Sequence, residues 1–282
     1  MFPPVNTKDA VAVEVAVQTA YLALFPAGDP KSVSRAFGWT VNAFTGGHPD
    51  YLPIDAAYHD LEHTLQGVLC LVQMLRTRQL AGASPPITQR LFQLGLLGML
   101  LHDSGYLKRH DDIEGTGAKY TVTHVQRSAE FAAALMTEKG FPALDILSVR
   151  NMIHCTGVDA VLARIDFQSE AERAVGLALG TADLLGQMAA EDYVEKLPAL
   201  YSEFAEAAQF AKDKTSIVGM FSSAQDLIKK TPTFWDYTRN RLTRDFGGMY
   251  RFLNDPYPFG PNHYLERVEA NVERVRQLVN KP

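Results

Sequence analysis

One histidine-aspartate pair in this chain lies at the end of a segment that is otherwise apolar enough to be buried. His102-Asp103 follows the stretch ITQRLFQLGLLGMLL, which is apolar on almost every side and therefore predicts a helix in the middle of the fold. Burying a polar pair there without partners would cost several kcal/mol. We therefore expect this pair to have polar partners, and a metal ion is one candidate.

Four further residues are the isolated polar groups of otherwise apolar segments, each in a different predicted helix. They are His63, His124, His154 and Asp183. Helices that pack around a common centre can bring such groups together. With the first pair they form a set of four imidazoles and two carboxylates, which suits Fe, Mn, Ni, Co, Zn or Mg better than thiolate-binding metals.

Helical periodicity dominates the elements that must position these residues, and no alternating pattern predicts a strand of five or more residues. Helices are predicted at about 8–25, 59–80, 87–103, 121–139, 144–155, 169–190, 191–212, 233–246 and 263–279. Glycine- and proline-rich breakers separate them, and none is long enough to be a flexible linker. The sequence predicts a single all-α domain over 1–282, with a metal-binding core at about 55–190 and a C-terminal helical extension at about 191–282.

The composition excludes several classes of protein. The 282 residues are 46% hydrophobic and 21% charged, as in ordinary globular proteins, and the net charge of −5 argues against nucleic acid polymers and anionic membranes as partners. Only Cys70 and Cys155 occur, which fits a reducing compartment. The N-terminal residues lack the features of a signal peptide, and the longest apolar run is too short to span a bilayer. We therefore expect a cytoplasmic protein.

The order of the motifs resembles the HD-domain metal-dependent phosphohydrolases. YHDLEH at 58–63, LLHDSGY at 100–106 and TADLLGQM at 181–188 stand in the order of that superfamily, with His124 and His154 between the last two. The chain is most similar to the cyclic-nucleotide phosphodiesterase branch and its bacterial relatives, whose first motif is Tyr-His-Asn-x-x-His. The resemblance covers about 55–212, because LPALYSEFAEAAQ also looks like a phosphodiesterase segment ending in Glu-Glu-Phe. It implies an HD-domain helical bundle.

The resemblance also implies roles for individual residues. Two divalent metal ions are implied, with Asp103 bridging them and His59 acting as the general acid for the leaving oxygen. The implied metal ligands are His63, His102, Asp103, His124, His154 and Asp183.

The substrate-binding part departs from known branches. HD-GYP proteins carry a lysine where this chain has Tyr106, and their Gly-Tyr-Pro motif is absent, so the sequence does not support cyclic-di-GMP as substrate. No residues align with the glutamine and phenylalanine that clamp the purine in eukaryotic phosphodiesterases. Tyr106, Lys108 and Gln187 are the candidate substrate contacts.

The resulting prediction is a metal-dependent phosphohydrolase, specifically a phosphodiesterase that hydrolyses a small nucleotide-like phosphate ester. A hydroxide bridging two ions would be a nucleophile at neutral pH, because metal binding lowers the pKa of water from 15.7 to about 7. Three alternatives stay open: a di-iron HD-domain oxygenase with the same ligands, a 5′-nucleotidase-type phosphomonoesterase, and a sensor that binds nucleotide without turnover. A homo-oligomer is possible.

Overall fold

The computed structural model describes residues 5–157, 160–211 and 219–280, and they fold into α-helices with no β-strand among them. This confirms the predicted all-α class. None of the described helices has the length and apolar character needed to cross a membrane. The helices are α1 (Ala10–Leu24), α2 (Ser32–Phe44), α3 (Leu61–Leu80), α4 (Gln89–Leu101), α5 (His124–Glu138), α6 (Ala143–Ile153), α7 (Glu170–Met188), α8 (Tyr193–Phe210), α9 (Ala224–Arg244) and α10 (His263–Val279).

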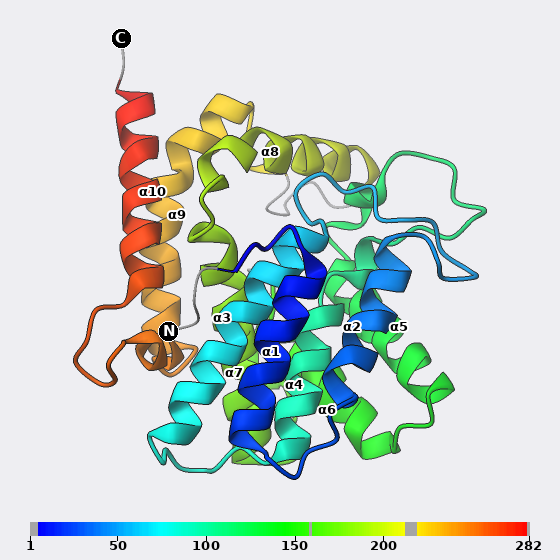
Figure 1. The fold of residues 1–282 in the computed structure, drawn as a ribbon. Helices are drawn as coiled ribbons and strands as arrows, with labels where there is room; N and C mark the ends of the chain where they lie inside the picture. Colours follow the sequence, from blue (N-terminus) through cyan, green and yellow to red (C-terminus); the bar gives the residue numbers. More distant parts are fainter. Residues whose placement is uncertain (1–4, 158–159, 212–218, 281–282) are drawn as a thin grey trace.

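Helices α3, α4 and α7 make up the centre of the bundle. As the sequence predicted, α4 is buried along nearly its whole length, and so is most of α3. Helices α1 and α2 cover one side of this centre, α5 and α6 flank it, and α8 runs across one end (Figure 1). Helices α9 and α10 lie along another side, where α10 packs against both α9 and α7. Helix α4 therefore holds its C-terminal residues inside the protein.

Two glycines allow α3 and α7 to cross at close range. A Cβ atom placed on Gly186 would lie 2.9 Å from both Cα and N of Gly67, which no real side chain tolerates. His63 lies one turn before Gly67, and Asp183 lies three residues before Gly186. The crossing therefore brings a histidine of one helix beside an aspartate of the other.

Helices α2 and α9 differ from the sequence prediction. Helix α2 was not predicted, because Gly38 and several polar residues interrupt its pattern, although Val33, Phe37, Thr40 and Phe44 are buried at helical spacing. Helix α9 begins at Ala224 rather than near 233, since it continues through Pro232. A proline is favoured in the first turn of a helix and costs stability farther inside one, so Pro232 is an unusual residue at this position of α9.

Candidate metal centre

Four of the predicted ligands, which lie on or directly after helices α3, α4 and α7, meet inside the bundle. His63 lies in the first turn of α3, where its N–H donates to the helix-capping carboxylate of Asp60 at 2.8 Å. His102 and Asp103 directly follow α4, and Asp183 lies in the fourth turn of α7. The start of α3, the end of α4 and an interior turn of α7 thus lie next to one another.

The ring nitrogens of the two histidines face both carboxylates. Nε2 of His63 lies 3.2 Å from Oδ2 of Asp103 and 3.4 Å from Oδ1 of Asp183. Nε2 of His102 lies at the same two distances from the same two oxygens. His63, His102 and Asp103 are buried, and Asp183 is partly buried, with 12% of its side chain exposed. One ligand atom each of His63, His102 and Asp103 lies within 4.8 Å of the other two and could hold one cation, and Asp183 lies against both histidines.

Three of these atoms have no conventional hydrogen bond. Nε2 of His63, Nε2 of His102 and Oδ2 of Asp103 are buried, and no donor or acceptor of the described residues meets them in hydrogen-bonding geometry. Nδ1 of His102 lies 2.7 Å from the carbonyl oxygen of Met99, so the proton on Nδ1 is bound there and Nε2 faces the carboxylates. Metal-binding histidines are held in this way. The donor set therefore fits a divalent ion that prefers nitrogen and oxygen ligands.

The charges of the metal-free cluster support the same interpretation. Burial alone would lower the pKa of His63, but the adjacent carboxylates of Asp103 and Asp183 raise it to about 9. The pKa of His102 is likewise raised against the effect of burial. Burial alone would raise the pKa values of the two carboxyl groups, but the histidines lower both. The two carboxylates thus favour positive charge at this point, which is the electrostatic condition for binding a cation.

Asp103 also faces a third histidine with its other oxygen. Oδ1 of Asp103 lies 3.8 Å from Nε2 of His124, the first residue of α5, whose Nδ1 is 2.6 Å from the carbonyl oxygen of Thr121. The close approach depends on Gly105, because a Cβ there would lie 2.0 Å from the carbonyl oxygen of His124. Each oxygen of the Asp103 carboxylate thus faces the imidazole of at least one histidine, as is expected of a carboxylate that bridges two metal ions.

His154 is the one predicted ligand that no described contact connects to this centre. It caps the end of α6 and is half-buried, and it makes no hydrogen bond, ion pair or ring contact with the other predicted ligands among the described residues. Burial, followed by the charge of Arg150, lowers its pKa. The structure therefore brings five of the six predicted ligands together.

His59 is positioned by an acid that the sequence analysis did not single out. The prediction placed His59 in the same helix as His63, but Asp60 caps the helix and α3 begins at Leu61. His59 is held instead by Glu203 of α8, whose Oε2 lies 2.5 Å from Nδ1 of His59 and whose Oε1 accepts the N–H of Tyr58 at 2.6 Å. The ring centres of His59 and His63 are 5.3 Å apart.

Glu203 is 3% exposed. Burial alone would raise its pKa, but the charge and hydrogen bond of His59 and the backbone N–H groups of Tyr58 and His59 lower it. Glu203 is therefore an ionised partner for the imidazole. The signal in the sequence was present in the phosphodiesterase-like segment LPALYSEFAEAAQ, where Glu203 is a charged residue that faces inward from an otherwise amphipathic helix.

Tyr106 lies between two histidine rings. Its ring centre is 4.6 Å from that of His59, with the planes 13° apart, and 4.8 Å from that of His124, with the planes 23° apart. Tyr106 is fully buried, and burial, followed by the charges of Asp103 and Glu203, raises its pKa. Its side chain therefore joins the candidate acid to the metal centre.

The other two candidate substrate contacts are engaged elsewhere. Nζ of Lys108 lies 3.0 Å from the carboxylate of Asp55 and 2.5 Å from the carbonyl oxygen of Gly115, so it ties two loops together. Gln187 accepts a hydrogen bond from the hydroxyl of Tyr58 at 2.7 Å and donates one to the carbonyl oxygen of Asp183 at 3.1 Å. It therefore supports Tyr58 next to the centre.

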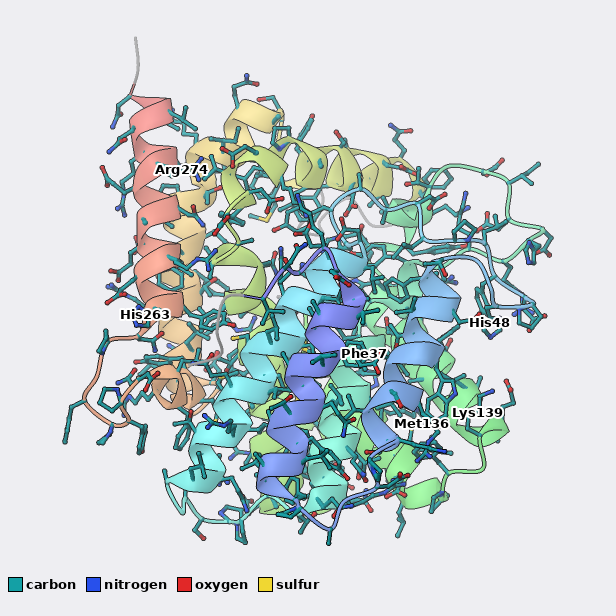
Figure 2. The ribbon with its side chains drawn as sticks, viewed as in Figure 1. Phe37, His48, Met136, Lys139, His263 and Arg274 are labelled. Atoms are coloured by element: carbon teal, nitrogen blue, oxygen red, sulfur yellow. The ribbon has the colours of Figure 1, made fainter. Side chains whose placement is uncertain are left out.

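The three histidines without a predicted role lie outside the centre. His48 and His263 lie toward opposite sides of the molecule in Figure 2, and His110 is exposed. His48 packs against the rings of Tyr51 and Phe131, and His263 pairs with Glu266 at the start of α10. Their contacts are those of surface and loop residues.

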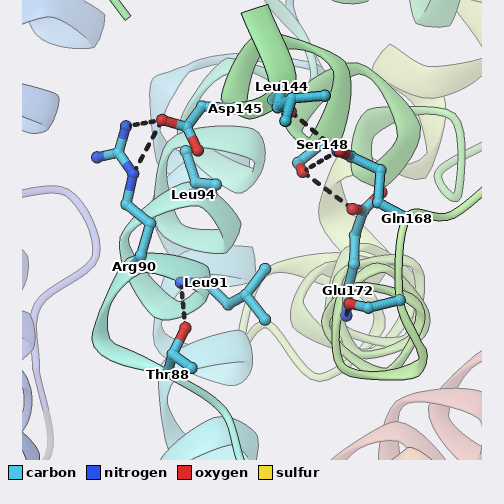
Figure 3. Close-up of a pocket in the computed structure, with 10 residues that line it drawn as sticks. Thr88, Arg90, Leu91, Leu94, Leu144, Asp145, Ser148, Gln168 and Glu172 are labelled. Carbon is cyan, nitrogen blue, oxygen red and sulfur yellow. Dashed lines mark hydrogen bonds and ion pairs between the residues drawn. The ribbon is translucent and has the colours of Figure 1, made fainter. Parts of the chain in front are cut away.

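A separate cavity of about 250 Å³ is lined by residues of α4, α6 and the start of α7 (Figure 3). None of the residues of the metal centre contributes to it. Glu172 at its edge accepts hydrogen bonds from Oγ of Ser148 at 2.9 Å and from Asn151 at 3.0 Å, while Ser169 caps α7. Its carboxylate therefore stabilises the packing of α6 against the start of α7.

A comparison with protein-family models matches part of the chain. A family model described as Npun_R2479-like matches residues 110–245, slightly less than half of the chain. The matched segment includes His124, Asp183 and Glu203, and it leaves His63 and His102 outside. No curated protein matches the chain.

Proposed function

We propose that this protein is a metal-dependent phosphohydrolase, most simply a phosphodiesterase acting on a small nucleotide-like phosphate ester. One observation carries the proposal. Buried ring nitrogens of His63 and His102, without hydrogen bonds, face the two carboxylates beside an imidazole, His59, that an ionised glutamate orients. A metal site and a proton donor side by side are what the cleavage of a phosphate ester requires.

The residues of the centre would hold one or two ions. His63, His102, Asp103 and Asp183 are the candidate ligands of the first, and His124, on the other oxygen of Asp103, supports a second. A divalent ion bound here would lower the pKa of coordinated water and stabilise negative charge on the phosphate oxygens. The sequence prediction of two ions thus remains the proposal.

His59 would supply the proton for the leaving oxygen. Its Nδ1 is occupied by Glu203, so Nε2 is the atom that can exchange a proton with substrate. A carboxylate on Nδ1 fixes the orientation of the ring and stabilises its positively charged form. After Nε2 has given up its proton, the hydrogen bond at Nδ1 keeps the neutral ring in place.

The proposed location is the cytoplasm. Both cysteines of the chain, Cys70 and Cys155, are buried free thiols. Unpaired thiols fit a reducing compartment.

The test combines metal analysis with a panel of substrates. Protein purified without chelator should contain about two equivalents of a transition metal and hydrolyse a nucleotide diester faster than the matching monoester. A single equivalent would remove the second ion, and a preference for the monoester would move the enzyme to the phosphatases. Metal-dependent O2 consumption without phosphate release would reject the hydrolase in favour of an oxygenase.

A further inference from the structure

The hydroxyl group of Tyr106 is a further polar group without a hydrogen bond near the metal centre, beside those of His63, His102 and Asp103. It is buried, and no hydrogen-bond partner meets it among the described residues. The hydroxyl of Thr121 lies close enough to lower the pKa of Tyr106, but it forms no hydrogen bond of normal geometry with it and donates its own proton to the carbonyl oxygen of Ala118 at 2.7 Å. Most buried polar groups in folded proteins have a partner, so an exception at a candidate active site calls for an explanation.

The basic side chains around the centre are already engaged. Lys108 pairs with Asp55, and Arg127 donates to the carbonyl oxygens of Gly105 and Leu107 at 2.7 and 2.8 Å. Lys196 lies 3.0 Å from Glu62, with two further carboxylates within 4 Å. Among these neighbours, the donor without a partner is the uncharged hydroxyl of Tyr106.

The stacking of Tyr106 keeps this hydroxyl in a fixed place. The ring is confined between His59, the candidate acid, and His124, a candidate ligand, at centre-to-centre distances of 4.6 and 4.8 Å. A group placed between a proton donor and a metal ligand is adjacent to the position that a phosphate must occupy to reach both. An unpaired donor in that position matches an anionic oxygen, which accepts hydrogen bonds and has no proton to give.

We propose that the Tyr106 hydroxyl binds the substrate by donating a hydrogen bond to an anionic oxygen of its phosphate group. This inference rests on the proposed function, since it names a contact of that substrate. It explains why the protein retains a buried hydroxyl that costs stability when no substrate is bound.

The variant that tests this inference is Tyr106→Phe, which keeps the stacked ring and removes the hydroxyl. Its Tm without substrate should equal or exceed that of the wild type, with a gain of up to about 2–4 °C, because an unpaired buried donor is removed. Metal content should not change. The kcat/KM for bis(p-nitrophenyl) phosphate should fall by about 10–100-fold, and the rise in Tm caused by inorganic phosphate should shrink.

Tyr21→Phe is the matched control. Tyr21 is also fully buried, but its hydroxyl accepts a hydrogen bond from Gln93 at 2.8 Å, and neither residue belongs to the metal centre. Its loss should lower Tm and leave kcat/KM unchanged. The two variants should therefore show opposite patterns of stability and activity.

The outcomes separate this inference from the proposed function. If Tyr106→Phe has lower Tm with unchanged kinetics and an unchanged response to phosphate, the hydroxyl is structural and the inference is wrong. A metal-loaded wild type that neither hydrolyses the diester nor responds to phosphate rejects the proposed function, and the inference with it. A response in the wild type that persists in Tyr106→Phe rejects the inference alone.

Discussion

Helix α7 carries two buried carboxylates with different surroundings. Near its start, Glu172 is 1% exposed, and each of its oxygens accepts a hydrogen bond from an uncharged side chain. Farther along, Asp183 meets His63 and His102, whose Nε2 atoms have no hydrogen bond. A buried polar group with all its hydrogen bonds in place stabilises a fold, whereas converging groups without them indicate a ligand.

The two positions also depend on different parts of the sequence. Glu172 stands three residues after the helix-capping Ser169, the spacing of a capping box, so a local pattern places it at the start of the helix. The surroundings of Asp183 depend on the crossing of α3 and α7 at Gly67 and Gly186. The first carboxylate is specified locally, and the second by the packing of the whole bundle.

The largest expected effect follows from Asp103→Ala. Asp103 faces His63 and His102 with one oxygen and His124 with the other, so its loss affects every part of the centre. Metal binding and hydrolysis should be abolished together, as measured by elemental analysis and a diesterase assay. A variant that keeps its full metal content would show that Asp103 is not a shared ligand.

His59→Ala should separate chemistry from metal binding. Metal content should stay at the level of the wild type, while turnover of a nucleotide diester should fall by about 10²–10⁴-fold, the range for a lost general acid. Hydrolysis of bis(p-nitrophenyl) phosphate should remain nearly normal, since its leaving group needs no proton. Equal losses on both substrates would show that His59 does not protonate the leaving group, and a loss of metal would make it a ligand.

A smaller effect is expected from Gly186→Ala. The added methyl group would meet the backbone of α3 at 2.9 Å, and backbone cannot move aside as a flexible side chain can. Overpacking of this kind costs about 1–3 kcal/mol, and here it should also separate Asp183 from His63 and weaken metal binding. Denaturant unfolding and metal titration measure the two effects.

Gly38→Ala is the control for this substitution. Gly38 lies on the exposed side of α2 with no atom within 4 Å of an added Cβ, so alanine should stabilise the helix by about 0.5–1 kcal/mol. Metal binding should not change. If both glycine variants behave alike, close packing of α3 against α7 does not position the centre.

Much of this arrangement could be predicted because it follows from periodicity. The apolar stretch before His102 placed α4 in the centre of the fold, and isolated polar residues in other helices indicated what would meet there. Helix α2 escaped prediction because Gly38 interrupts a pattern whose buried residues are only evident once its partners are known.

The contact between His59 and Glu203 could not be derived from spacing. The two residues are 144 positions apart, and their contact requires α8 to cross the end of the bundle. The same limit applies to His154, which has the residue type and order of a ligand but no described contact with the centre. Residue type and order select candidates, and only packing determines which of them meet.

Glu172→Gln should give the smallest functional effect and the clearest test of the contrast within α7. The amide keeps the shape of the side chain, but its NH2 group can donate only, so one of the bonds from Ser148 and Asn151 loses its acceptor. Leaving that buried group unsatisfied should lower the free energy of unfolding by about 1–3 kcal/mol. Metal content and kcat/KM, measured on the folded fraction, should match the wild type because no residue of the metal centre touches Glu172.

Glu170→Gln is the control: that side chain is 79% exposed in the same helical turn, so stability should barely change. If Glu172→Gln loses metal while Glu170→Gln does not, the two carboxylates of α7 belong to one connected site, and the division between a structural and a ligand-binding group is wrong.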